Sequence, residues 1–145
     1  MLKISKLADY ALVLMGHLSK TNGRYSATQL AQAAHLSVPT TSKVLKLLNE
    51  VGLLSSERGS QGGYQLTKAA AQISVAEIIA AMDGRVMMTE CGHGRNQCEH
   101  ESHCSLKANW RLINKAINSV LNNISLEDMT KPLAQPIHFH KLPKN

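Results

Sequence analysis

Apolar side chains recur at steps of three and four residues from Ile4 to Leu18, and this spacing places them along one face of an α-helix. A shorter helix is predicted from Ser26, because Ser26-Ala-Thr-Gln29 has the form of a capping box, which satisfies the first free amides of a helix. The stretch 35–37 breaks this second helix. Ser37 is a suitable N-cap for a third helix that ends at Gly52.

A short helix, a tight turn and a longer helix form a helix-turn-helix. In such a unit the second helix lies in the major groove of DNA, and residues near its start face the bases. The polar side chains that we expect to face DNA from this helix are Ser37, Thr40, Thr41, Ser42, Lys43 and Lys46. The alternative is that they form an ordinary solvated helix face.

Two short stretches with strand character, 53–56 and 64–67, flank the glycine-rich segment 57–63. This pattern predicts a β-hairpin directly after the helix-turn-helix, which is the wing of a winged helix. Arg58 and Ser60 lie on the wing and are expected to meet the minor groove or a phosphate. The predicted fold class is therefore mostly α with a small β-hairpin wing.

A second capping box, Ser74-Val-Ala-Glu77, opens a further helix that Gly84 closes. Beyond it, apolar residues at spacings of four and three predict a helix roughly 30 Å long. The residues of this apolar stripe are Leu106, Trp110, Ile113, Ile117, Val120 and Ile124. We expect the stripe to pack against the same helix of a second copy in a two-fold dimer, because it is long for so small a body. The alternative is that the helix folds back onto the first helix of its own chain.

These patterns divide the chain into four parts. Residues 1–84 are predicted to form the winged helix-turn-helix DNA-binding domain, and residues 85–104 a cysteine-rich loop. Residues 105–130 are predicted to form the dimerisation helix and a short helix capped by Ser125, and residues 131–145 a loosely ordered tail.

Charge is concentrated in the first half of the chain. Residues 1–68 carry eight Lys or Arg against three acids, whereas residues 69–145 carry eight against seven, which together give the formal net charge of +6. A basic half is typical of a nucleic-acid-binding protein, although it also serves solubility.

All three cysteines fall within fourteen residues, as Cys91, Cys98 and Cys104, in a loop that also carries His93, His100 and His103. Thiolates and imidazoles held in one loop are what a soft or borderline metal centre needs. The odd number of cysteines argues against a disulfide framework and favours reduced thiols in the cytoplasm.

Other classes of protein fit the sequence poorly. There is no long uncharged apolar stretch that would span a membrane, and no phosphate loop, nucleophile elbow or paired carboxylates of an enzyme. We therefore expect a cytoplasmic, non-enzymatic protein without a membrane partner or a small-molecule substrate.

Five ordered motifs resemble the winged-helix iron-sulfur regulators of bacteria, of the IscR and NsrR type. They are the run 5–12, the wing 57–66, the segment 73–79, the three-cysteine loop and the run 121–126. The resemblance covers about residues 1–130 and implies a homodimer that binds palindromic promoter DNA. By overall likeness it implies a repressor of SUF-type iron-sulfur assembly genes.

The resemblance also implies a set of cluster ligands. Cys91, Cys98 and Cys104 match the three cluster cysteines, although the first gap is one residue longer than in the two named types. In IscR-like members a histidine three residues beyond the last cysteine is the fourth ligand, and here that position is Lys107. In NsrR-like members it is an aspartate on the first helix of the partner subunit, and Asp9 stands at that place. Asp9 is thus the first candidate, ahead of His103, and a [2Fe–2S] cluster is expected ahead of a [4Fe–4S] one.

The expected mechanism is a switch in which loss or oxidation of the cluster changes the affinity for the operator. A nitric-oxide sensor of the same fold is one alternative. Two others use the same cysteines differently: a structural zinc site completed by a loop histidine, and a metal-free thiol redox sensor.

Overall fold

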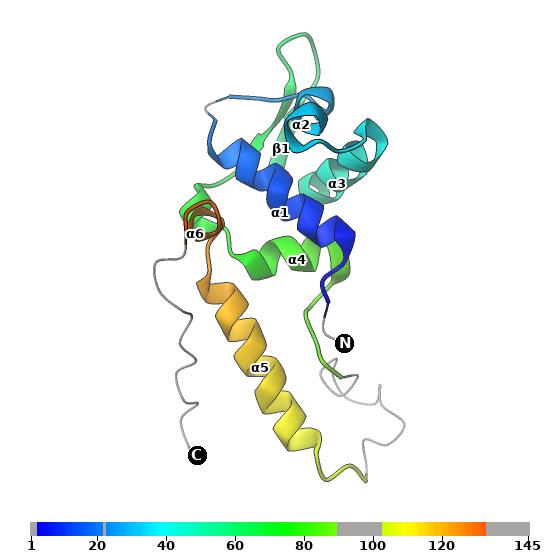
Figure 1. Cartoon of the computed structure of the whole chain (residues 1–145), viewed down its shortest axis with the longest axis vertical. Helices are drawn as coiled ribbons and strands as arrows, with labels where there is room; N and C mark the ends of the chain where they lie inside the picture. The colour runs from blue at the N-terminus through cyan, green and yellow to red at the C-terminus, as the bar shows by residue number, and fades with distance from the viewer. Residues whose placement is uncertain (1–2, 22, 90–102, 133–145) are drawn as a thin grey trace.

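The computed structural model describes residues 3–21, 23–89 and 103–132, and it confirms a mostly helical chain with one hairpin (Figure 1). The elements in chain order are α1 (Lys6–Ser19), α2 (Ala27–Ala34), α3 (Val38–Glu50), β1 (Leu54–Glu57), β2 (Gly63–Leu66), the 3-10 helix η1 (Ala70–Gln72), α4 (Val75–Asp83), α5 (Lys107–Asn123) and α6 (Leu126–Met129). Most of the predicted cysteine-rich loop, together with residues 133–145 of the predicted tail, lies outside the described residues.

Serine caps set the starts of the helices, as the sequence predicts for Ser26, Ser37, Ser74 and Ser125. The first helix differs slightly from its prediction, because it begins at Lys6 instead of Ile4. The Ser5 hydroxyl accepts the amide of Ala8 at 3.1 Å and so acts as its N-cap. The turn between α2 and α3 is made by His35, which takes the left-handed conformation with φ 54°.

The core of the winged helix is formed by one face each of α1, α3 and α4 together with β1. Its fully buried side chains include Leu14, Met15, Val44, Leu45, Leu48, Leu54 and Ile78. The hairpin packs on this core with Leu54 paired to Leu66, and Tyr25 extends the sheet by exchanging two backbone hydrogen bonds with Tyr64, at 3.0 and 2.8 Å. The loop before α2 and the wing are therefore one hydrogen-bonded unit.

Helix α5 extends away from the winged helix, at the end of the molecule opposite the hairpin (Figure 1). Only its C-terminal end reaches the body, where Leu121 and Ile124 pack against Ala8, Val75 and Ile79. α6 then packs on α1, held by a backbone hydrogen bond from Leu126 to Ile73 at 2.8 Å. The alternative in which the long helix folds back along α1 of its own chain is therefore wrong.

Candidate DNA-binding face and metal centre

The second helix of the helix-turn-helix, α3, presents a cationic outer face. Lys43 and Lys46 are exposed, and Lys46 makes only a long ion pair with Glu50, at 3.9 Å one turn further on. At the start of the helix the Ser37 hydroxyl accepts the Thr40 amide at 3.3 Å and donates to the Thr40 hydroxyl at 2.8 Å. The Ser37 hydroxyl is thus used in the helix cap, and Ser37 remains a candidate DNA contact in addition to that role.

Thr41 does not face solvent, which corrects its prediction as a DNA-facing residue. Its side chain is fully buried, and its hydroxyl oxygen has no hydrogen-bond partner among the residues that the structure describes. Thr41 shares the inner face of α3 with Val44, Leu45 and Leu48, because residues three, four and seven positions apart lie on one side of a helix. Because threonine is polar, its residue type did not indicate a core position. The only sequence signal was its spacing from Val44 and Leu45.

The wing carries Arg58 and Ser60 as exposed residues, between the two strands. Its base is fixed by an ion pair between Arg24, whose side chain is 19% exposed, and Glu57. Arg24 lies in the loop before α2, so the pair ties the wing to the helix-turn-helix. An anchored hairpin with a free arginine at its tip suits contact with a nucleic-acid backbone.

The predicted metal ligands are only partly described. Cys104 is a free, half-buried thiol just before α5, and the neighbouring His103 is exposed. Asp9 is exposed on α1, where it lines a concavity of about 320 Å³ together with His17 and Lys20. The remaining candidates, Cys91, Cys98, His93 and His100, lie outside the described residues. Within residues 3–21, 23–89 and 103–132, no three His, Cys, Asp or Glu side chains are placed to hold a metal ion.

The described donors nevertheless suit an iron-sulfur cluster. Cys104 is free of any disulfide and is partly shielded from solvent, as a cluster thiolate needs to be. The Asp9 carboxylate is exposed on the surface of its own chain, which leaves it accessible to a ligand set on a second copy.

Helix α5 has two distinct faces. Its predicted apolar stripe is partly exposed: Leu106 is 56% exposed and Ile113 is 42% exposed, while Trp110, Ile117, Val120 and Ile124 are half-buried. A neighbouring face is lined with asparagines and packs on the segment that follows α4. There Asn114 accepts the Met88 amide at 2.8 Å, and Asn118 donates to the Val86 carbonyl at 2.7 Å. Exposed apolar side chains and hydrogen-bonded asparagines therefore lie on different faces of one helix.

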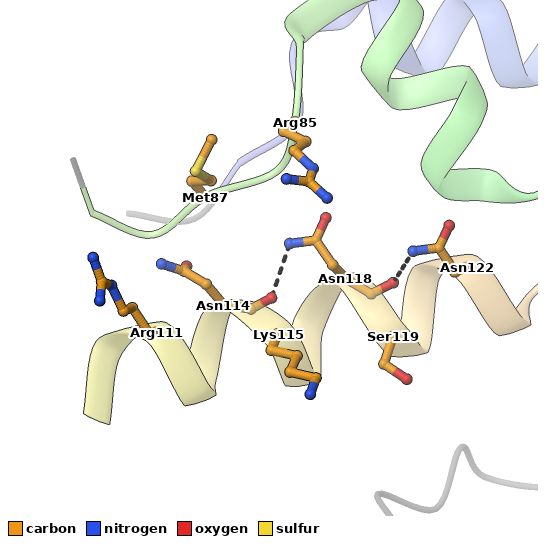
Figure 2. A pocket seen from close by; sticks show the side chains of 8 residues that line it. All are labelled: Arg85, Met87, Arg111, Asn114, Lys115, Asn118, Ser119 and Asn122. Atoms are coloured by element: carbon orange, nitrogen blue, oxygen red, sulfur yellow. Dashed lines mark hydrogen bonds between the residues drawn. The ribbon is translucent and has the colours of Figure 1, made fainter. Parts of the chain in front are cut away.

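The asparagine face also lines a concavity of about 360 Å³, shown in Figure 2. Arg85 reaches toward it from the segment after α4, and Arg111 and Lys115 of α5 also line it. Asn114 is only 6% exposed, and the nitrogen of its side-chain amide has no hydrogen-bond partner among the described residues. This face was not predicted from the sequence, although Asn114, Asn118 and Asn122 recur at steps of four residues, because the burial of this face depends on the segment 86–88.

No helix in the described part of the chain is both long enough and apolar enough to cross a membrane. The family model Rrf2, described as an iron-dependent transcriptional regulator, matches residues 4–132. The chain is 32% identical over 132 residues to the HTH-type transcriptional regulator IscR of Xenorhabdus nematophila, covering 90% of this chain and 80% of that protein.

Two solved structures are similar over most of their length. CymR, the global cysteine regulator of B. subtilis, has 30% identity and a TM-score of 0.73, over 90% of this chain and 97% of that one. T. potens IscR has 29% identity and a TM-score of 0.67, over 88% and 85% of the two chains.

Proposed function

This chain belongs to the Rrf2 family of iron-dependent transcriptional regulators, and on that basis we propose that it is a homodimeric regulator whose affinity for promoter DNA is switched by an iron-sulfur cluster. The observation that carries the proposal is the position of the cysteine segment. Residues 85–106 join α4, which packs on α1 and α3, to α5, whose apolar stripe is partly exposed. A change of ligation in this segment therefore acts on the connection between the DNA-binding unit and the dimer helix.

In the proposed dimer, the apolar face of α5 is buried against a second copy. Cys91, Cys98 and Cys104 of one chain hold the cluster, and Asp9 of the other chain completes the ligand set. When bound, the cluster supplies a redox-active and oxygen-labile centre. Asp9 lies on α1, which packs directly on α3, so its ligation bears on the position of the recognition helix. The half-sites of a dimer lie about 34 Å apart, so small rotations between subunits alter operator affinity strongly.

The regulated genes that we propose are those of iron-sulfur cluster assembly, of the SUF type, with the protein acting as a repressor on a palindromic operator. Similarity to IscR proteins supports this assignment. A nitric-oxide-sensing repressor of the same fold is the alternative within the cluster-binding class. The cluster-loaded protein is titrated with nitric oxide or with oxygen, and its operator affinity is measured after each addition. The two results separate the two signals.

The test is an absorption spectrum together with iron, sulfide and zinc analysis on protein purified without oxygen. Visible absorption with matching iron and sulfide is expected, and Cys98→Ala and Cys104→Ala should lose it while remaining folded dimers. Full colour in either variant would contradict the three-cysteine assignment. One zinc per chain and no colour would mean a fixed structural site.

A thiol redox sensor is the second candidate, and the similarity to the cysteine regulator CymR favours it. The half-buried free thiol of Cys104 fits this chemistry as well. Colourless, metal-free protein whose operator affinity falls after mild oxidation and returns with a dithiol reductant would establish this function in place of the cluster switch.

A further inference from the structure

The first residue of α3 is an exposed apolar side chain. Val38 is 42% exposed, although it stands at the start of the helix that the fold presents to DNA. Valine has a lower helix propensity than alanine or leucine, and an exposed isopropyl group adds little to the core. Its exposure therefore has no evident structural benefit in the free protein.

The Ser37 and Thr41 hydroxyls near Val38 are hydrogen-bonded in one case and buried in the other. The Ser37 hydroxyl donates its proton to the Thr40 hydroxyl, and the Thr41 hydroxyl is buried. Pro39, next in the chain, is exposed and has no amide proton. The first turn of α3 thus offers DNA an apolar surface, with the Thr40 hydroxyl as its remaining side-chain donor.

Val38 also begins a row along one edge of the helix. Ser42 and Lys46 follow at four-residue intervals, so the row changes from apolar to hydroxyl to cationic toward the C-terminus. The N-terminal residues of a recognition helix contact base edges, whereas lysines further along favour phosphates. The apolar group that base pairs present in the major groove is the 5-methyl group of thymine.

We propose that Val38 contacts the methyl group of a thymine in each operator half-site and is a specificity-determining residue of this regulator. The inference rests on the proposed function, in which α3 lies in the major groove. It requires neither a bound cluster nor a particular signal.

The test replaces thymine by uracil, which removes the methyl group and leaves every hydrogen-bonding group of the base pair in place. The operator is first selected from a random duplex library with the wild-type protein. Each thymine is then replaced in turn by deoxyuridine in both half-sites, and the dissociation constants of the wild type and Val38→Ala are compared. At one of these positions, the replacement should raise the dissociation constant of the wild type by about fourfold per half-site. This is the contribution of one buried methyl group. Val38→Ala should bind the thymine and uracil operators equally.

Val51→Ala is the matched control, because Val51 is 55% exposed at the opposite end of the same helix. This variant should keep the wild-type ratio of thymine to uracil affinity, and thermal unfolding should confirm that both variants are folded. The inference is overturned if the wild type binds its operator without discriminating thymine from uracil, or if Val38→Ala still discriminates. A folded wild type that selects no duplex at all would instead overturn the proposed function, and this inference with it.

Discussion

Asn118 donates its side-chain amide to the carbonyl oxygen of Val86 at 2.7 Å and to that of Asn114 at 2.8 Å. The bond to Val86 and the bond from the Met88 amide to Asn114 join the middle of α5 to the segment that follows α4. The bond to Asn114 lies within α5 and is drawn in Figure 2. These directional bonds add to the apolar packing of Leu121 and Ile124 at the end of the helix.

Replacement of Asn118 by alanine should destabilise the protein by about 1 to 2 kcal/mol, because the partly buried Val86 carbonyl loses its donor. Urea unfolding measures this loss. Asn122→Ala is the matched control, since Asn122 is exposed and, among the described residues, bonds only within α5, to the Asn118 carbonyl at 2.7 Å. Equal effects of the two substitutions would show that the contact with Val86 does not stabilise α5.

Gly63 stands where the hairpin approaches the backbone of Tyr25. Its φ is +139°, and a Cβ atom there would lie 2.7 Å from the Tyr25 carbonyl carbon and oxygen. Gly63→Ala should therefore lower the free energy of unfolding by more than about 2 kcal/mol and loosen the wing. Gly59→Ala is the comparison, because Gly59 has φ +115° but open space around it, so only the backbone cost of about 1 kcal/mol applies. Thermal unfolding would contradict this if both variants lost the same stability.

The Glu77 carboxylate connects the capping box of α4 to Lys68. The hydrogen bond from Lys68 at 2.8 Å, followed by that from the Ser74 amide at 2.8 Å, holds the pKa of Glu77 below its ordinary value of 4.5. A lowered folded-state pKa stabilises the protein above pH 4.5, and this stabilisation is lost as pH falls through the folded pKa.

Glu77→Gln should accordingly be less stable than the wild type at pH 7, and the difference should disappear at pH 3. Because Glu77 and Lys68 are 41% and 38% exposed, solvent screening keeps the difference below about 1 kcal/mol. Urea unfolding at the two pH values measures it, and Lys68→Met should remove much of the pH dependence. A difference that stayed constant between pH 3 and 7 would contradict the role of the charge.

Much of the fold follows from local sequence signals. The serine caps and the glycine-rich wing identify their elements because the chemistry of a cap or a tight turn is confined to a few neighbouring residues. Thr41 and the asparagine face of α5 could not be read in the same way, because their burial depends on segments distant in sequence. The β-bridge between Tyr25 and Tyr64 was not predicted for the same reason, because no local sequence pattern indicates an isolated bridge.

Asp9 is the candidate fourth ligand, and its position on the surface of α1 makes it testable without harm to the fold. Because its side chain is exposed, Asp9→Ala should leave thermal stability within about 0.5 kcal/mol of the wild type. The rate of cluster loss in air, monitored by visible absorption, should rise by roughly an order of magnitude. Even residues that only hydrogen-bond to metal ligands change metal affinity on this scale. His103→Ala should lose its cluster at the wild-type rate, and the reverse result would transfer the role to His103.

A mixture of Asp9→Ala and Cys104→Ala chains tests whether the carboxylate comes from the partner subunit. In the mixed dimer, the chain that keeps Cys104 faces a partner that keeps Asp9, so one of the two sites regains its full ligand set. Slow cluster loss should therefore reappear in mixed dimers isolated by two affinity tags. If Asp9 acted within its own chain, no site in the mixed dimer would be complete and the rapid loss would persist.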